Sequence, residues 1–300
     1  MDTTTMSEYY PHYPAFRPDL VTQCKERGDF MPLLFEWYKY VGLVSNLLAG
    51  IATVHSHQSV LHLAILRGSL NRCSRLMLAT IRLAAEAKYG ESIRIFSRLI
   101  TETAVKTEWL IFQNSEYAFK RYLAGGLRAE VKLKKRIEDN VDRRNGQMLR
   151  IEQRMLHSIN RYMKLSGLSM DEISNIPDVP DLASMYNDLG LSDEQYIGVY
   201  RLGSQYVHGT WSDLVSHYLR IDDKGEFNLR DHDVVPDEGT FSSTCLIVLR
   251  SMSAFASYFF DDEELRKAHL VYFDDTQGRI MEIFSWGSGS DLELVTKDAF

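Results

Sequence analysis

Apolar residues recur at intervals of three and four positions along most of the chain after about Phe30. This spacing places them on one face of an α-helix, and it predicts helices over residues 33–54, 59–90, 91–113 and 127–165. Asn145 and Gly146 are expected to kink or break the last of these helices. A further helix is predicted from Ser192 to about His208, because SDEQ at 192–195 has capping-box spacing and Gly209 follows.

The pattern changes after this helix. Residues 217–230 alternate between apolar and polar around Gly225, which predicts a β-hairpin near 218–230. An apolar helix is predicted over 240–260, whereas residues 270–284 fit either a second small hairpin or a short helix. Residues 174–190 hold Pro177 and Pro180, so they are predicted to form the main loop region.

These elements predict a mainly α fold, a bundle of long antiparallel helices with a small C-terminal β-hairpin appendage. Residues 1–28 carry three prolines and are expected to form an extended arm. Residues 29–285 are expected to form a single helical domain. Residues 286–300 begin with WGSGS and are expected to form a flexible tail.

The composition is that of an ordinary globular protein, with 45% hydrophobic and 25% charged residues in a chain of 300. No basic start with an apolar run is seen, and the longest apolar run, 41–54, is too short to span a bilayer, so no membrane association is expected. The three cysteines lack a C-x-x-C pattern. They argue against disulfides and a cysteine zinc site, and they suit a cytoplasmic protein. No cofactor and no metal site is expected.

Charge is unevenly distributed along the chain, whose net charge is −7. Residues 120–164 hold 13 Lys and Arg against 5 acids, a local net charge of 13 − 5 = +8. One interpretation is a solvated charged helix. The other is a basic face that binds RNA, for which the candidate residues are Lys132, Lys134, Lys135 and Arg136.

Arg201 and His208 are seven residues apart, which places them on one helix face with Ser204 and Gln205 between them. A guanidinium balances phosphate charge and an imidazole moves protons near neutral pH, so the set suits phosphodiester chemistry. About two Arg–His pairs at such spacing are expected by chance, and Arg150 with His157 is the other one present. The structural alternative is that Arg201 pairs with a buried acid and His208 lies at a helix end.

A second polar set lies on the predicted helix 91–113, where Arg98 and Glu102 are one turn apart. They form either a surface pair or, in the sharper alternative, a buried link in which Glu102 reaches a residue such as Arg201. Two polar stripes on apolar helices are best satisfied by contacting each other. Arg98 and Glu102 are therefore expected within hydrogen-bonding reach of the Arg201–His208 helix.

An Arg-x-x-x-Glu helix, a basic helix, then Y-x-x-x-S-x-x-x-H-G, a hairpin and an apolar helix together resemble the bacterial family called domain of unknown function 5677. The residues that carry the likeness are Arg98, Glu102, Tyr200, Ser204, His208 and Gly209. The resemblance implies a helical bundle with a shared polar site. The Arg–His spacing is also similar to that of HEPN-domain ribonucleases, which are metal-independent and dimerise to form their active site. Leu202 departs from the polar residue usual after their arginine.

Two functions are consistent with these features. The first is a HEPN-like metal-independent ribonuclease, or a nuclease-derived toxin or anti-phage defence protein, that acts on RNA through Arg201 and His208. The second is a non-enzymatic helical module that binds a regulatory protein or a small ligand in a polar pocket formed by Arg98, Glu102 and His208. A homodimer is an expected assembly.

Overall fold

The structure is a computed structural model that describes residues 3–51, 58–85, 88–192, 202–231 and 234–288. The chain divides into two compact units. The first unit comprises residues 1–111 and 185–300, and the second comprises residues 112–184. The two units are described separately, and the proposed single domain over 29–285 stays a prediction.

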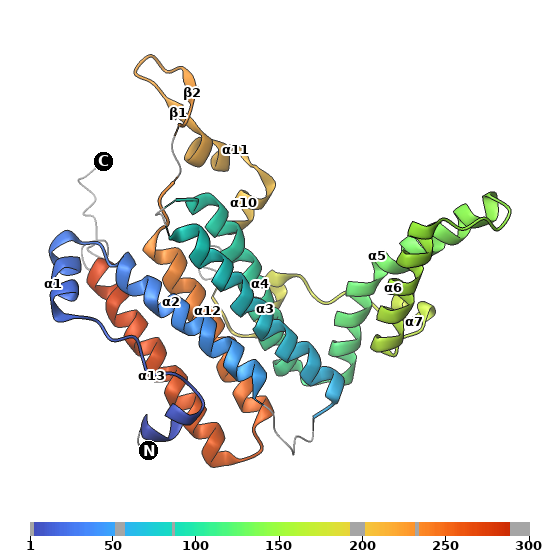
Figure 1. Cartoon of the computed structure of the whole chain (residues 1–300), viewed down its shortest axis with the longest axis horizontal. Helices are drawn as coiled ribbons and strands as arrows, with labels where there is room; N and C mark the ends of the chain where they lie inside the picture. Colours follow the sequence, from blue (N-terminus) through green and yellow to red (C-terminus); the bar gives the residue numbers. More distant parts are fainter. Residues whose placement is uncertain (1–2, 52–57, 86–87, 193–201, 232–233, 289–300) are drawn as a thin grey trace. The chain divides into compact units, whose positions relative to one another are not determined.

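The first unit is built on long helices that lie side by side (Figure 1). They are α2 (Met31–Gly50), α3 (Val60–Ala84), α4 (Gly90–Gln113), α12 (Glu238–Phe259) and α13 (Glu263–Ser288). α2 packs on α3, α12 and α13. The predicted mainly α bundle is therefore confirmed.

The apolar periodicity of these helices forms the core. On α3, Leu66, Leu70 and Met77 are fully buried at helical spacing. α2 and α3 approach closely at Gly42, where a β-carbon would lie 3.2 Å from Cβ of Met77. Polar contacts join the helices as well, because the Ser97 and Thr244 hydroxyls lie 2.6 Å apart between α4 and α12.

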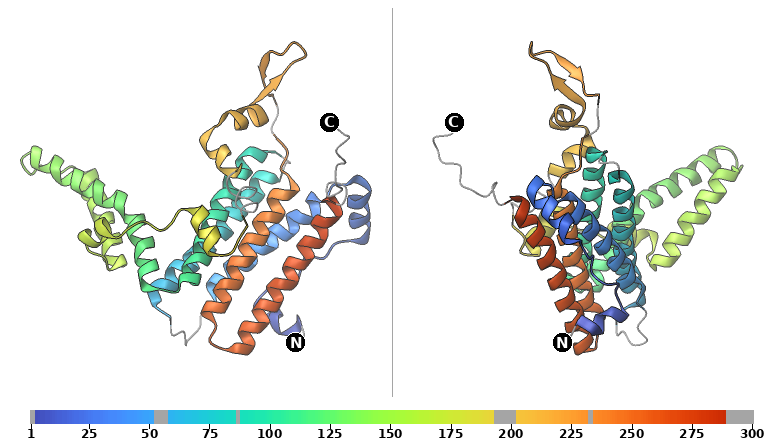
Figure 2. Two further views of the ribbon diagram at one scale, coloured as in Figure 1. Left: turned by 180° about the vertical axis from the view of Figure 1, so that it is seen from behind. Right: turned by 60° about the vertical axis from the view of Figure 1, so that its left-hand side comes forward.

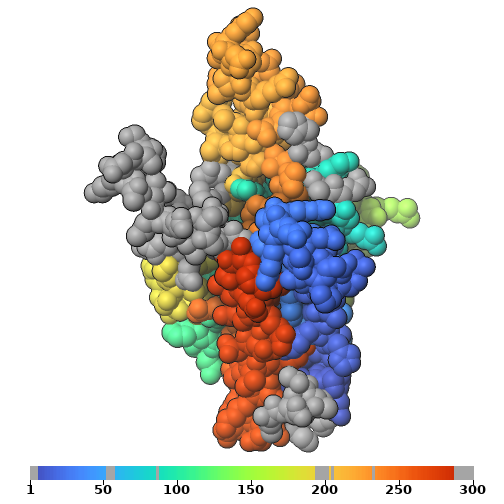
Figure 3. All heavy atoms as spheres, turned by 90° about the vertical axis from the view of Figure 1, so that its left-hand side faces the viewer, coloured from blue at the N-terminus to red at the C-terminus, as the bar shows by residue number. Residues whose placement is uncertain are grey.

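The N-terminal residues do not form the single extended arm that the sequence predicts. A short 3₁₀ helix, η1, covers Thr3–Glu8, and α1 covers Pro18–Arg27. α1 forms because Pro18 supplies the fixed φ of a first helical residue, and Gly28 ends the helix in the left-handed conformation at φ 64°. Between these helices the chain runs against α13, as the blue and red segments in Figure 3 show.

The structure corrects one predicted segment and decides between the two alternatives for another. The loop region 174–190 contains α8 (Leu182–Asp188), which Asp181 caps by accepting a hydrogen bond from the backbone N–H of Ser184 at 2.8 Å. Residues 270–284 form part of α13 and not a hairpin, because Tyr272, Ile280 and Ile283 are buried along one side of a helix. α13 also extends to Ser288, into the proposed tail, whose residues 289–300 lie outside the described part.

The predicted hairpin near 218–230 is present. β1 (Leu219–Ile221) pairs antiparallel with β2 (Phe227–Leu229), with Arg220 opposite Asn228. Before it come α10 (Leu202–His208), α11 (Trp211–Asp213) and a π-helical turn, η3 (Leu214–Tyr218). The hairpin projects away from the long helices of the first unit in both views of Figure 2.

The second unit is a helical hairpin of α5 (Glu116–Arg143) and α6 (Arg150–Ser166), followed by α7 (Met170–Asn175). Asn145 and Gly146 have positive φ, which breaks the predicted long helix in two. Glu152 stabilises the turn between the two helices by accepting hydrogen bonds from the Arg144 side chain and the Leu149 backbone N–H. The same two hydrogen bonds lower the pKa of the Glu152 carboxyl group. A small core forms around Ala124, Leu127, Leu168 and Ile173.

Within the described ranges, no helix is both long enough and apolar enough to cross a membrane.

Candidate functional site

The predicted Arg201–His208 stripe lies partly outside the described residues. Tyr200 and Arg201 are not described, nor are the side chains of Ser204 and Gln205. His208 is described. It is exposed at the end of α10, where Gly209 ends the helix in the left-handed conformation at φ 57°. The imidazole is therefore accessible to a large ligand.

Gly203 is one of the points at which α10 contacts α4. A β-carbon on Gly203 would lie 3.4 Å from Cβ of Arg98, so the glycine allows the arginine stem to pack against the helix. Glu102, one turn further along α4, accepts a hydrogen bond from Lys106 at 2.5 Å. The structure therefore brings Arg98 beside α10 and gives Glu102 a partner on its own helix. Contact between these two side chains and Arg201 or His208 stays a prediction.

Arg94, one turn before Arg98 on α4, ties α10 to two other helices. It donates a hydrogen bond to the Tyr206 hydroxyl on α10, and its guanidinium lies 4.9 Å from the centroid of that ring. It also pairs with Asp237 at 3.1 Å. Asp237 caps α12 by accepting a hydrogen bond from the backbone N–H of Thr240 at 2.7 Å. One arginine thus holds α4, α10 and the start of α12 together.

A buried carboxylate–imidazole pair contacts the same tyrosine of α10. Asp213 and His217 lie one helical turn apart, with Oδ1 and Nδ1 separated by 3.0 Å, and both side chains are buried. The imidazole meets the Tyr206 ring edge-on, with centroids 5.0 Å apart. A carboxylate on Nδ1 fixes the tautomer and orientation of an imidazole. Because both side chains are shielded from solvent, this pair stabilises the packing around α10 and offers no group to a ligand.

A second carboxylate, that of Glu91, and the phenol of Tyr218 lie near the Asp213–His217 pair. Burial, followed by the charges of Asp213 and Glu91, raises the pKa of the Tyr218 hydroxyl. Oε2 of Glu91 is buried and has no hydrogen-bond partner among the described residues. The first turn of α4 is itself closely packed, since a β-carbon on Gly90 would lie 2.7 Å from the carbonyl oxygen of Val234. The surroundings of α10 are therefore dense and polar.

Four of these residues were not predicted from the sequence: Arg94, Tyr206, Asp213 and His217. The i, i+4 spacing of Asp213 and His217 was the available signal, but the pair falls in a short segment between the predicted helix and the hairpin. Burial of that segment depends on Tyr206 from α10, which no local pattern reveals.

The comparison with family models matches residues 63–227 of the chain to a family of unknown function, DUF5677. The match covers more than half of the 300 residues and runs from the first turn of α3 to the first residue of β2. The chain belongs to DUF5677. No curated protein and no solved structure matches it significantly.

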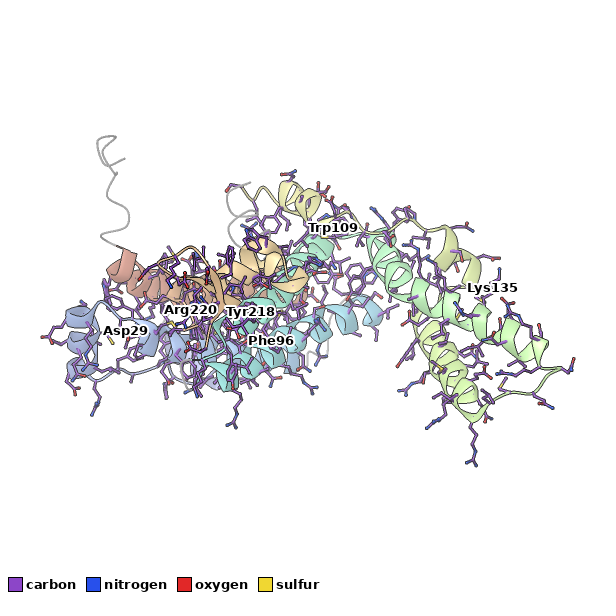
Figure 4. The ribbon with its side chains drawn as sticks, turned by 90° about the horizontal axis from the view of Figure 1, so that it is seen from above. Asp29, Phe96, Trp109, Lys135, Tyr218 and Arg220 are labelled. Carbon is purple, nitrogen blue, oxygen red and sulfur yellow. The ribbon has the colours of Figure 1, made fainter. Side chains whose placement is uncertain are left out.

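The four predicted RNA-binding residues of this DUF5677 chain lie on α5 in the second unit, where Figure 4 labels Lys135. Lys132, Lys135 and Arg136 are exposed and share one helix face. Lys134 is turned toward α6, because it donates a hydrogen bond to Oδ1 of Asn160 at 3.0 Å. Three of the four predicted RNA-binding side chains are therefore available to a ligand on one surface.

His, Cys, Asp and Glu are the side chains through which the described part of the DUF5677 chain could ligate a metal. No group of three or more His, Cys, Asp or Glu side chains there has the geometry to hold a metal ion.

Proposed function

We propose that this DUF5677 chain is a HEPN-like, metal-independent ribonuclease that acts on RNA through His208 and Arg201. The observation that carries the proposal is the exposure of His208 at the end of α10. An imidazole that moves a proton during phosphodiester cleavage must reach the backbone of a polymer. His217, the buried imidazole nearby, is committed to Asp213.

The packing of α10 also supports this function. A catalytic side chain must be held by neighbours whose own positions are locked. The Tyr206 side chain of α10 is held both by the hydrogen bond from Arg94 and by the edge-on contact with the His217 ring. The contact of Gly203 with Arg98 adds a third fixed point. These contacts fix the position of α10, the helix that carries His208.

The roles follow from the chemistry of RNA. The 2′-hydroxyl attacks the adjacent phosphorus, the bond to the 5′-oxygen breaks, and a 2′,3′-cyclic phosphate and a 5′-hydroxyl end are formed. His208 transfers the proton between these oxygens, and Arg201 stabilises the charge that develops on the phosphate. Ser204 is assigned to the catalytic set with them, and Gln205, Tyr200, Arg98 and Glu102 are assigned supporting roles. DNA lacks the 2′-hydroxyl and is not a substrate.

The exposed face of α5 formed by Lys132, Lys135 and Arg136 is assigned to backbone contacts with RNA, because cations neutralise phosphate charge without reading sequence. A ribonuclease of this kind would serve as a toxin or an anti-phage defence protein. Induced expression of the wild-type chain in bacteria should then arrest growth, and expression of His208→Ala should not.

The test is cleavage of RNA by the purified chain in the presence of EDTA. Wild-type protein should cleave, and both His208→Ala and Arg201→Ala should be inactive while keeping the wild-type melting temperature. The matched control is the double variant Arg150→Ala, His157→Ala, which removes the other Arg–His pair of the same spacing and should keep full activity. Activity that disappears with EDTA, or that persists in His208→Ala, would exclude the assignment.

A second candidate function is a non-enzymatic module that binds a small ligand, and one observation favours it. A cavity of about 360 Å³ is lined by residues of the N-terminal segment and α13, including Tyr10, Tyr13, Tyr272 and Arg279. Its size is that of a small-molecule site. It is not the proposed Arg98, Glu102 and His208 pocket. A thermal shift with 4-hydroxybenzoate, lost in Arg279→Gln, would support this function.

A further inference from the structure

The β1–β2 hairpin has a rigidly specified turn. Oδ1 of Asp222 accepts hydrogen bonds from the backbone N–H groups of Lys224 and Glu226, both at 2.9 Å. Asn228 donates to the other carboxylate oxygen at 3.1 Å. Gly225 takes the positive φ of 80° that closes the turn. Hydrogen bonding to the backbone lowers the pKa of Asp222, so the turn keeps its charged cap at neutral pH.

This turn fixes a register that places apolar residues together. Leu219 faces Leu229 and Ile221 faces Phe227 across the two strands. Cross-strand partners, and residues two apart in a strand, point to the same side of a sheet. Those four side chains form one side, which we call the hairpin face, while Arg220 and Asn228 lie on the other.

Three of the four side chains of the hairpin face are exposed, and Leu219 is half-buried. Leu229 is 78% exposed, Ile221 57% and Phe227 54%. Trp211, itself 63% exposed, meets the Phe227 ring edge-on at 5.5 Å between centroids and extends the apolar surface without covering it. A two-stranded hairpin is marginally stable in water unless its apolar side packs on something. An exposed apolar patch of this kind marks an interaction surface.

The charges around the hairpin select the class of partner. Residues 219–231 hold both signs in near balance, with three cations against four acids: Arg220, Lys224 and Arg230, and Asp222, Asp223, Glu226 and Asp231. A polyanion such as RNA and an anionic lipid surface both favour a clear excess of cations, which is absent. A surface that mixes both signs around an apolar centre is complementary to itself in a two-fold arrangement.

We propose that the hairpin face is the contact between two copies of this chain. Two such faces would pack against each other as stacked sheets do, about 10 Å apart, with the residues of one copy meeting the same residues of the other. This inference does not depend on ribonuclease activity, because its readout is the mass of the protein in solution.

The first experiment measures that mass. Wild-type protein should sediment at twice the 34.6 kDa of one chain. Phe227→Asp and Leu229→Asp place a charge in the centre of the contact and should raise the dissociation constant at least about 30-fold. The matched control is Val271→Asp, because Val271 on α13 is 65% exposed. This control should remain a dimer. A monomeric wild-type chain, or a dimer that survives both hairpin substitutions, would overturn the proposal.

The second experiment is a cross-link that remains informative if the aspartate variants fail to fold. The three native cysteines are buried, and burial raises the pKa of Cys73 to about 12, so they react poorly. Phe227→Cys therefore adds the one exposed thiol and should form a disulfide-linked dimer under mild oxidation. Val271→Cys should stay a monomer in denaturing gels. Equal cross-linking of the two variants would contradict the proposal, as would a monomeric wild type whose hairpin variants lose only RNA or vesicle binding.

Discussion

His269 on α13 gives a prediction whose magnitude follows from the structure. Its side chain is 0% exposed and stacks on Phe260 with ring centroids 4.2 Å apart. Nδ1 shares a hydrogen bond with the Tyr10 hydroxyl at 3.3 Å, and Nε2 is buried without a partner among the described residues. Burial disfavours the charged imidazolium and lowers the pKa of His269 to about 4.

The sign and size of the pH effect follow from this shift. In the unfolded chain the histidine has its ordinary pKa of about 6.5, so between pH 4 and 6.5 the unfolded state binds more protons than the folded state. The free energy of unfolding is therefore undiminished above about pH 6.5 and falls as the pH drops toward 4. At about pH 5 the loss from this one group amounts to about 2 kcal/mol.

The assay is urea unfolding of wild type and His269→Phe at about pH 7.5 and about pH 5. Phenylalanine keeps the aromatic packing and removes the titrating group. The Tyr10 hydroxyl then loses its partner, which costs about 1 kcal/mol at both pH values and cancels in the comparison. Wild type should lose about 2 kcal/mol more than the variant between the two pH values.

The matched control is His12→Phe, the same substitution at an exposed position of the first unit. It should retain the wild-type pH dependence. If wild type and His269→Phe lose the same stability on acidification, the imidazole is not held neutral by burial and the reasoning fails.

Three further predictions concern the rest of the chain. Gly90→Ala should lower the free energy of unfolding in urea by about 1–3 kcal/mol, because the new β-carbon would meet backbone oxygens. The control Gly68→Ala, with open space around it, should raise this free energy by about 0.5–1 kcal/mol. Equal effects of the two substitutions would refute the close approach at Gly90. Tyr206→Phe should cost about 1–2 kcal/mol in the same assay by removing the acceptor of Arg94, and a neutral result would contradict that link. Replacing four basic side chains of α5 by alanine should weaken RNA binding and flatten its salt dependence. The four are Lys132, Lys134, Lys135 and Arg136. An unchanged dependence of binding on salt concentration would assign them to solubility alone.

The fold was largely predictable because its helices carry a repeated apolar spacing, and the hairpin because alternation flanks Gly225. Where residues that favour different structures lie close together in the chain, the local pattern did not decide between helix and another structure. Residues 270–284 contain Gly278 and mixed spacing, and their helical state is decided by burial against the N-terminal segment and α12. α1 was not predicted because three prolines in residues 1–28 favour an extended chain, whereas Pro18 also fits the first position of a helix.

The candidate site was predictable only in part. A glycine inside a predicted helix is a signal of close packing, and the structure places the Arg98 stem against Gly203. The buried partners of α10 could not be read from sequence, because Asp213 and His217 become a pair only when their segment is wound into a helix beneath Tyr206. Hydrogen bonding across distant segments is a property of the fold and not of any local spacing.

The most direct test of the proposed function is the chemical nature of the ends produced when the purified chain acts on a defined RNA in EDTA. The account predicts a 2′,3′-cyclic phosphate on one product and a 5′-hydroxyl on the other, formed by wild type and absent with His208→Ala. No cleavage of a substituted RNA that lacks the 2′-hydroxyl at the scissile position should be seen. Products with a 5′-phosphate, or cyclic phosphate formation that continues in a folded His208→Ala variant, would contradict the account.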